Sequence, residues 1–360
     1  MLPADGVGGG QRERSRLGSQ AEGRGPLNIV CGIDEAGYGP RLGPLVVGCS
    51  AFSAEDDVPT GRELARTLSP RVRWVRKRLP SRRPGPHRDT VLIGDSKILY
   101  SRDRRGLARL EGAVLAFVGA AYGEIPARLD DLQRLLCCSR EDEGFPPLPW
   151  YGRPGLELPL AADSHRVAEQ SIALRDHLSA RGLSVHLGCR LVPETEYNHR
   201  VACDDNKASL LFRASLEAAL VTGLERNAGV ERRATVFLDR QGGRKYYAAL
   251  LEASFPLCPV TAVEEGAARS CYRVETGGDR LTFDFLLGGE DRQPAIALAS
   301  MVAKYVREVV MESFNRHWKR RVPDLAPTAG YWTDAGRFLA ELDPHLLPSD
   351  PDRRLFVRQV

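Results

Sequence analysis

The pattern of apolar and polar positions predicts buried strands that follow a polar N-terminal stretch. Residues 1–27 are rich in Gly, Arg and Ser and lack apolar periodicity, which is typical of a disordered tail. The runs at 29–33 and 45–52 are almost continuously apolar, as buried strands are. A short glycine-rich segment, 37–44, separates them, so we expect these two strands to pair in an antiparallel sheet.

Later segments show helical and strand-like patterns in turn. Apolar residues recur at helical spacing in four segments, 101–117, 165–180, 205–224 and 294–318, of which the last has Pro294 in its first turn. Strands are predicted at 183–191, 234–238 and 271–287, the last being a hairpin around Gly277-Gly278. Strands come first and helices alternate with them later, which predicts an α/β fold with a mixed central sheet flanked by helices.

Composition narrows the class of protein. The chain has 360 residues, 42% hydrophobic and 27% charged, which is ordinary for a globular protein and excludes collagen, coiled coil and global disorder. No stretch approaches the roughly 18–20 apolar residues of a membrane span, and the first 27 residues lack a secretory signal's apolar block. Eight cysteines without a C-x-x-C pair argue against a zinc ribbon. We therefore expect a soluble, cytoplasmic protein with mostly free thiols.

The net charge of +4 decides little, but its distribution is uneven. Residues 61–89 contain ten Lys or Arg and two acidic residues, with Trp74 in the middle. Such a run suits a phosphate backbone, and the alternative is a solvated, arginine-rich loop. If the run binds phosphates, neutralising four of its residues should weaken nucleic-acid binding and flatten the salt dependence of binding. These residues are Arg73, Arg76, Lys77 and Arg78.

Carboxylates stand at the ends of three predicted strands. Asp34 and Glu35 follow the first strand, Asp239 ends a later one, and Glu290 and Asp291 precede the long helix. Neighbouring strand residues face opposite sides, so we expect the strand to break at the Asp34–Glu35 pair. A carboxylate near an apolar strand is costly unless a cation or hydrogen bonds compensate it, and the alternative is a set of solvated turns. Three such ends predict a site for hard divalent cations.

These segments resemble the motifs of a known family, ribonuclease HII. Gly32-Ile33-Asp34-Glu35-Ala36-Gly37-Tyr38-Gly39-Pro40 is similar to the family's opening signature. Further resemblances follow in the family's order at Gly94-Asp95-Ser96-Lys97, Asn206 to Leu220, Val236 to Asp239, Glu290 to Lys304, Gly330-Tyr331 and Arg353 to Phe356. The resemblance implies a ribonuclease H-like catalytic domain over 28–360, with a C-terminal helical segment and with inserted loops and a hairpin near 54–89, 139–190 and 244–280.

The resemblance also implies residue roles. The metal-binding and catalytic acids would be Asp34, Glu35, Asp239 and Glu290, which together hold two Mg²⁺ or Mn²⁺ ions. Glu290 stands where the family has Asp, and Asp291 is the adjacent alternative. Substrate contacts would come from Gly37, Tyr38, Gly39, Lys97, Ser300, Lys304 and Tyr331. Tyr38 replaces the family's usual Arg, and Ala329 replaces a Lys.

The implied activity is hydrolysis of the RNA strand of an RNA–DNA hybrid, leaving 5′-phosphate and 3′-hydroxyl ends. The substrate would be such a hybrid or a DNA duplex with embedded ribonucleotides, encountered in DNA replication and repair; no membrane and no obligate protein partner are implied. Two alternatives stay open. One is a catalytically weak relative that binds hybrids, which the departures at Tyr38, Glu290 and Ala329 favour. The other is a different two-metal nuclease of the same fold.

Overall fold

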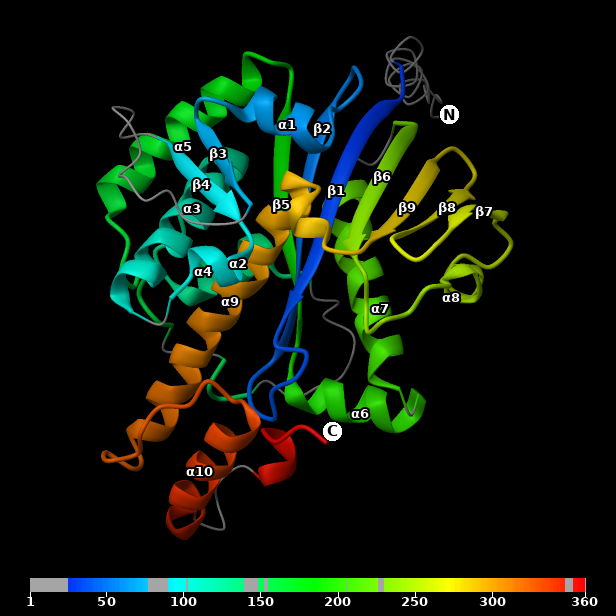
Figure 1. Ribbon diagram of the computed structural model, residues 1–360. Coiled ribbons are helices and arrows are strands. Elements are labelled where there is room, and N and C mark those ends of the chain that lie inside the picture. Colours follow the sequence, from blue (N-terminus) through cyan, green and yellow to red (C-terminus); the bar gives the residue numbers. More distant parts are fainter. Residues whose placement is uncertain are drawn as a thin grey trace, which may run out of the picture.

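A seven-stranded mixed sheet forms the centre of the molecule (Figure 1). The computed structural model describes residues 25–76, 90–101, 103–138, 148–151, 155–204, 206–225, 230–346 and 352–359. The strands lie in the order β5-β2-β1-β6-β9-β8-β7. Their bounds are β1 (Leu27–Ala36), β2 (Leu45–Ala54), β5 (Ser184–Val192), β6 (Arg232–Asp239), β7 (Val260–Glu265), β8 (Arg269–Glu275) and β9 (Arg280–Leu286). A separate parallel pair consists of β3 (Val72–Val75) and β4 (Val91–Gly94).

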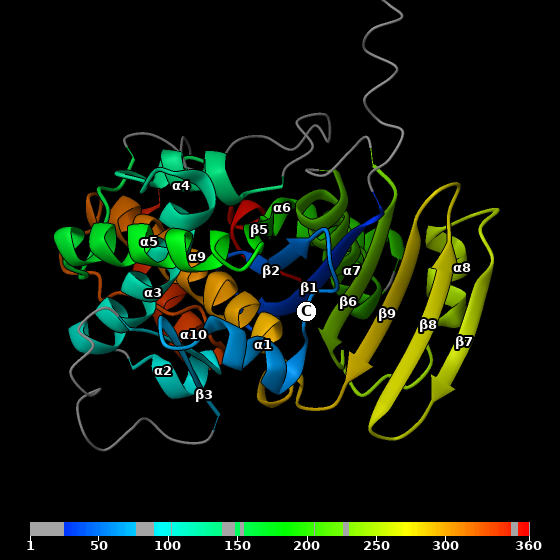
Figure 2. The ribbon, with the colours of Figure 1, turned by 90° about the horizontal axis from the view of Figure 1, so that it is seen from above.

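Helices cover both faces of this sheet. Figure 2 shows α1, α3, α5 and α9 on one side and α7 and α8 on the other. The helices are α1 (Gly61–Leu68), α2 (Ser96–Leu99), α3 (Arg104–Tyr122), α4 (Leu129–Leu136), α5 (Ser164–Ser179), α6 (Glu194–Asp204), α7 (Lys207–Ala219), α8 (Ala248–Ser254), α9 (Pro294–Lys319) and α10 (Trp332–Leu342). Each face therefore has its own apolar core, one around α3 and α9 and one around α7.

The longest helix, α9, lies directly on the two central strands because glycines leave room for its backbone. A Cβ added at Gly32 of β1 would stand 2.1 Å from the carbonyl carbon of Ala295, and one at Gly48 of β2 would stand 2.2 Å from the Ala299 oxygen. These distances are far below any real Cβ contact. The helix start, and with it the segment just before Pro294, is therefore held next to the end of β1.

The predicted fold class is confirmed: the sheet is mixed and flanked by helices on both sides. β1 and β2 pair antiparallel from Asn28↔Ala54 to Ala36↔Val46, and β8 and β9 form the hairpin expected around Gly277-Gly278. The expectation that the first strand breaks at Asp34–Glu35 is wrong, because this pairing continues through both residues to Ala36. The apolar pattern did not reveal α6, α8 or β7.

Within the basic run, the structure forms α1 and β3, so this part is not an irregular loop. Its last part, 77–89, lies outside the described residues, as do residues 1–24 of the predicted tail and 139–147 and 152–154 of the second predicted insertion. All eight cysteines are free thiols, as expected. Among the helices that the structure describes, none combines the length and the apolar character needed to cross a membrane.

Candidate active site

Four carboxylates gather where β1 and β6 end and α9 begins. β1 and β6 are parallel neighbours, with Ile33 opposite Leu238, so Asp34, Glu35 and Asp239 arrive at the same edge of the sheet. Glu290 belongs to a short 3₁₀ turn, Gly289–Asp291, that follows β9, the other neighbour of β6. All four side chains are partly buried. We call Asp34, Glu35, Asp239 and Glu290 the carboxylate cluster.

Mutual repulsion and burial weaken the acidity of the cluster. Burial, followed by the charges of Glu35 and Glu290, raises the pKa of Asp34 well above its usual value. Burial and the charge of Asp239 raise the pKa of Glu35 to about 7. Asp34 and Glu290 also share a hydrogen bond, which favours the protonated form of Asp34 and the charged form of Glu290. The four acids therefore form one electrostatic unit that a cation would stabilise.

Backbone and hydroxyl donors orient two of these carboxylates. The Gly289 N–H donates to Oδ1 of Asp239 at 2.8 Å, and the Ser300 hydroxyl donates to Oε1 of Glu290 at 2.5 Å. Ser96 stands 3.1 Å from Ser300 on its other side. Ser300 itself is 2% exposed, and its hydroxyl contacts Glu290 and Ser96.

The neighbouring acid Asp291 is exposed, whereas Glu290 lies inside the cluster. The electrostatic partners of Asp34 and Glu35 include Glu290. Between the two alternatives that the sequence left open, the structure thus places Glu290 with the other acids.

Lys97 is a cation whose charge acts on Glu35 and Glu290, and it comes from the first turn of α2. Burial alone would lower its pKa, but the carboxylates around it, Glu290 and Asp95 first, raise the pKa above the usual value. Asp95 caps α2 by accepting the Lys97 N–H at 2.8 Å, and its charge also acts on Glu290. Sequence reasoning used the Gly94–Lys97 motif but did not assign Asp95 a place beside the cluster.

Lys304 lies one turn further along α9 than Ser300. Its ammonium pairs with Glu308 at 2.5 Å and stands 4.5 Å from the centre of the Tyr100 ring. Tyr100 in turn donates to Glu308 at 2.7 Å. Lys304 is therefore already engaged by partners on its own helix and α2, and it is not among the main charges acting on the cluster acids.

The glycine-rich turn after β1 contains two glycines with different surroundings. Gly37 has φ +86°, and a Cβ there would meet the Arg307 side chain at 2.4 Å, so both conformation and packing require glycine. At Gly39, an added Cβ would meet no atom within 4 Å. Tyr38 between them is partly buried, and the Lys207 ammonium lies 5.2 Å from its ring centre. The turn thus presents an open backbone at Gly39 with a lysine close by.

Two buried arginines donate hydrogen bonds to carbonyl groups in and beside this turn, and neither belongs to the motifs that the sequence singles out. Arg358 donates to the Gly37 carbonyl at 2.5 Å, and Arg307 donates to the carbonyls of Leu42 and Ala329 at 3.3 and 3.1 Å. Both guanidinium groups are at most 2% exposed. Arg358 lies in the terminal segment, and only its distant partners in the chain reveal its role.

Glu194 supplies the opposing charge beneath the same turn. Its Oε1 accepts the Gly43 N–H at 3.0 Å and the Tyr151 hydroxyl at 2.8 Å. Complete burial raises its pKa to about 7, although these hydrogen bonds and the charge of Arg358 oppose the shift. We call Arg307, Arg358 and Glu194 the turn support.

Tyr331 stands beside this turn. The amides of Arg41 and Leu42 both donate to the carbonyl of Gly330, which ties the two loops together. The Tyr331 ring lies 5.8 Å from the Arg307 guanidinium and is 46% exposed. An aromatic side chain that is half exposed next to an open backbone can stack on a sugar or base.

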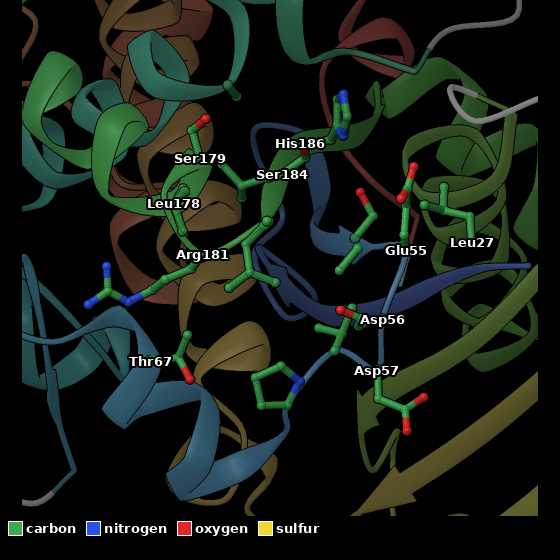
Figure 3. Close-up of a pocket in the computed structure, with 18 of the residues that line it drawn as sticks. Leu27, Glu55, Asp56, Asp57, Thr67, Leu178, Ser179, Arg181, Ser184 and His186 are labelled. Atoms are coloured by element: carbon green, nitrogen blue, oxygen red, sulfur yellow. The ribbon is translucent and has the colours of Figure 1, made fainter. Parts of the chain in front are cut away.

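A hollow of about 1250 Å³ lies elsewhere on the molecule (Figure 3). Its walls include the start of β1 at Leu27, the end of β2 at Ala54 and the start of β5 at Ser184. Asp34 and Glu35 lie at the opposite end of β1. None of the site residues that the sequence predicts lines this hollow.

Comparison with known proteins identifies similar chains. No family model matches the sequence. A 47-residue segment is 45% identical to a ribonuclease HII from Pyrobaculum islandicum. This segment makes up 13% of the present chain and 24% of the relative's length.

Solved structures of ribonucleases H also align over most of the chain. The ribonuclease HII in a PCNA complex from Archaeoglobus fulgidus is 16% identical, with 92% of this chain and 97% of that one covered and a TM-score of 0.38. Ribonuclease H2 from Pyrococcus horikoshii is 14% identical, with 91% and 92% covered and a TM-score of 0.38. Such loose superpositions assign no site residue, so the site rests on the geometry above. Over this 47-residue segment the chain is similar to a ribonuclease HII.

Proposed function

We propose that this protein is a metal-dependent endonuclease of the ribonuclease HII type, which hydrolyses the RNA strand of RNA–DNA hybrids. The observation that carries the proposal is the carboxylate cluster. Four partly buried acids repel one another at the end of β1, and they include the residues of the motif that resembles the family's opening signature. A fold has no structural use for such an arrangement unless a cation offsets the repulsion.

The residues present fit divalent metal ions of the Mg²⁺ or Mn²⁺ kind. All four candidate ligands are carboxylates, the donors that hard cations prefer. Among the described residues, no three acidic, His or Cys side chains converge closely enough to hold an ion as they stand. Asp34, Glu35, Asp239 and Glu290 would hold the metal. Bound there, it would activate a water molecule and stabilise the charge that develops on the leaving oxygen.

The surrounding residues have roles that do not depend on the metal. Lys97 supplies a positive charge within the cluster and is suited to attract the phosphate that is cut. The open backbone at Gly39 allows close approach by a ribose, whose 2′-hydroxyl distinguishes RNA from DNA. Tyr331 offers its exposed ring on the adjoining loop. Together these contacts would place a single ribonucleotide next to the acids.

Two labelled duplexes test the proposal: a full RNA–DNA hybrid and a DNA duplex with one ribonucleotide. Each is incubated with the protein and Mg²⁺ or Mn²⁺, beside Asp34→Asn as the matched control. We expect the wild type to cut the hybrid and Asp34→Asn to be inactive. Cleavage of both duplexes extends the proposal to ribonucleotide removal during DNA repair, whereas cleavage of the hybrid alone shows that Tyr38 restricts the enzyme to longer RNA tracts.

Two other results would overturn the proposed activity. Tight binding of the hybrid without cleavage in either metal would identify a hybrid-binding relative, the candidate that Tyr38 and Glu290 favour as departures from the family pattern. Cleavage that persists when every ribose is replaced by deoxyribose would identify a DNA nuclease that uses the same acids.

A further inference from the structure

A second charged surface lies outside the carboxylate cluster, in the basic run after β2. Four arginines line one hollow of about 610 Å³ between α1 and β3, together with Trp74. They are Arg62, Arg66, Arg73 and Arg76, and all four side chains are exposed. We call this hollow the arginine groove.

The arginine groove is built by regular elements, so its charges are held in place. Arg62 and Arg66 are four residues apart on α1 and therefore share one face of the helix. Arg73 lies within β3, and Arg76 follows it, with its guanidinium 5.3 Å from the centre of the Trp74 ring. Within the described residues, no carboxylate forms an ion pair with any of the four. Their positive charge is thus available to an external anion.

The arginine groove adjoins the carboxylate cluster at two points. β3 and β4 are parallel, with Val75 opposite Gly94. Arg76, the residue after β3, therefore lies near Asp95 and Lys97, which follow β4. The first residue of α1 is also tied to the cluster side, because the Gly61 N–H donates to Oε1 of Gln293 at 2.8 Å. Gln293 is three residues from Glu290. Figure 1 places α1, β3 and β4 on the same side of the sheet as α9.

We propose that the arginine groove binds the phosphate backbone of the nucleic-acid duplex on one side of the cut site. This inference rests on the proposed nuclease function and adds a second contact to it. The four guanidinium groups lie in one hollow and have no carboxylate partner among the described residues. They match a row of phosphates, to which Arg offers several donors in one plane. An acidic protein partner would fit the charge, but the groove begins beside the acids that would cut a nucleic acid. A duplex that enters the cluster therefore passes the groove.

This placement has a kinetic consequence. The acids determine the rate of cleavage, and the arginine groove determines how firmly a long duplex is held. We expect a duplex that ends before the groove to lose this contact. Affinity should then depend on duplex length, and the salt dependence of binding should report the number of phosphates held.

The test compares two fourfold variants of the full chain. The groove variant combines Arg62→Gln, Arg66→Gln, Arg73→Gln and Arg76→Gln. The control variant makes the same charge change at four exposed arginines on and near α4 and α5: Arg128→Gln, Arg134→Gln, Arg175→Gln and Arg181→Gln. Thermal unfolding of both variants confirms that each is folded.

Binding is measured first, on a long RNA–DNA hybrid without divalent metal, so that no cleavage is needed. We expect the groove variant to bind about tenfold or more weakly, with the slope of log K against log salt less steep by about 3 to 4. The control variant should keep the slope of the wild type. An unchanged slope in the groove variant, or an equal change in the control, overturns the proposal. So does a loss confined to single-stranded nucleic acid.

Cleavage measurements then distinguish failure of the groove proposal from failure of the proposed nuclease activity. With Mg²⁺, the groove variant should show a raised KM on the long hybrid and an unchanged kcat, while a hybrid too short to reach the groove is cut as by the wild type. If the wild type binds through the groove but cuts nothing, the nuclease proposal fails and the groove stands. If the wild type cuts and the groove variant matches it on both duplexes, the groove proposal fails alone.

Discussion

Two groups of charged side chains lie around the end of β1, and they are stabilised in opposite ways. The carboxylate cluster contains like charges, which repel one another and are only partly buried. The turn support contains two arginines and one glutamate, which are fully buried and which bind five backbone groups and the Tyr151 hydroxyl. The first group needs a cation from outside, whereas the second is held by hydrogen bonds to backbone groups within the protein.

The difference shows that the residues proposed to bind metal are distinct from the residues that hold the glycine-rich turn. Because the hydrogen bonds of the turn support are made within the protein, it holds the glycine-rich turn without a bound ion. The carboxylate cluster keeps its unfavourable charge until an ion arrives, so its affinity for a metal includes relief of that repulsion. The turn support and the carboxylate cluster therefore lie close together, and only the carboxylate cluster needs a bound ion.

The largest expected effect is the removal of one acid from the carboxylate cluster. Asp34→Asn should lower the cleavage rate roughly a thousandfold or more, equivalent to about 4 kcal/mol of barrier, because a metal ligand is lost. The same change should raise the melting temperature without metal, since it removes a repelling charge. Single-turnover cleavage and calorimetry check the two effects.

Addition of Mg²⁺ sharpens this prediction. The wild type should melt at a higher temperature with Mg²⁺ because the ion binds the native state only, and Asp34→Asn should show a smaller rise. Equal rises in both proteins would mean that the carboxylate cluster does not bind the ion.

The next effect concerns the hydroxyl that orients Glu290. Ser300→Ala should lower cleavage about 10- to 100-fold, as loss of an outer partner of a metal ligand does. Ser171→Ala is the matched control, since Ser171 is also a buried helical serine but donates to the Val167 carbonyl within α5. A similar loss of activity in both variants would point to stability rather than to Glu290.

Substitutions at the two glycines of the turn should affect different properties, stability at Gly37 and cleavage at Gly39. Gly37→Ala should destabilise the protein by about 2–3 kcal/mol, because a Cβ collides with Arg307 and φ is positive. Gly39→Ala should change stability by less than about 0.5 kcal/mol, yet lower cleavage about 10- to 100-fold by displacing the ribose. Urea unfolding and cleavage rates are compared for both. Full activity of Gly39→Ala would remove the close approach at this residue from the proposal.

The last effect is a pH dependence that arises in the turn support. The pKa of Glu194 is about 7 in the folded protein and 4.5 ordinarily, so between these values the native state binds more protons than the unfolded state. Stability should therefore fall as pH rises from about 4.5 to about 7, by on the order of 3 kcal/mol. Glu194→Gln should lose the share of this slope that comes from Glu194, while the share from the carboxylate cluster remains. Urea midpoints at several pH values measure it, and parallel profiles for the two proteins would contradict the assignment.

Much of the fold could be predicted from the sequence because its strands and helices have strong local patterns. Apolar runs marked β1, β2, β5 and β6, and helical spacing marked α3, α5, α7 and α9. The edge strand β7 was missed because it is exposed almost throughout and has no buried apolar face to show. Helix α6 has mixed polar residues and gave no clear period.

The carboxylate cluster was also foreseeable, since each acid stands directly at the end of a strong strand pattern. The residues that contact the carboxylate cluster could not be foreseen from the sequence. Asp95 reaches the cluster because α2 packs beside α9, and Ser300 turns out to hold Glu290 because both lie at the same end of that helix. Such relations depend on which elements are neighbours in space.

By itself, the sequence determined the order of elements and the acids that end the strands, because both follow from local hydrophobic patterning and from residue types at turns. Only the tertiary structure decided that Arg358 supports Gly37, 321 positions away, and that Arg62 and Arg76 share a groove beside the acids. The physical reason is that the energy of a buried or paired charge depends on its surroundings in space, and folding brings those surroundings from distant parts of the chain.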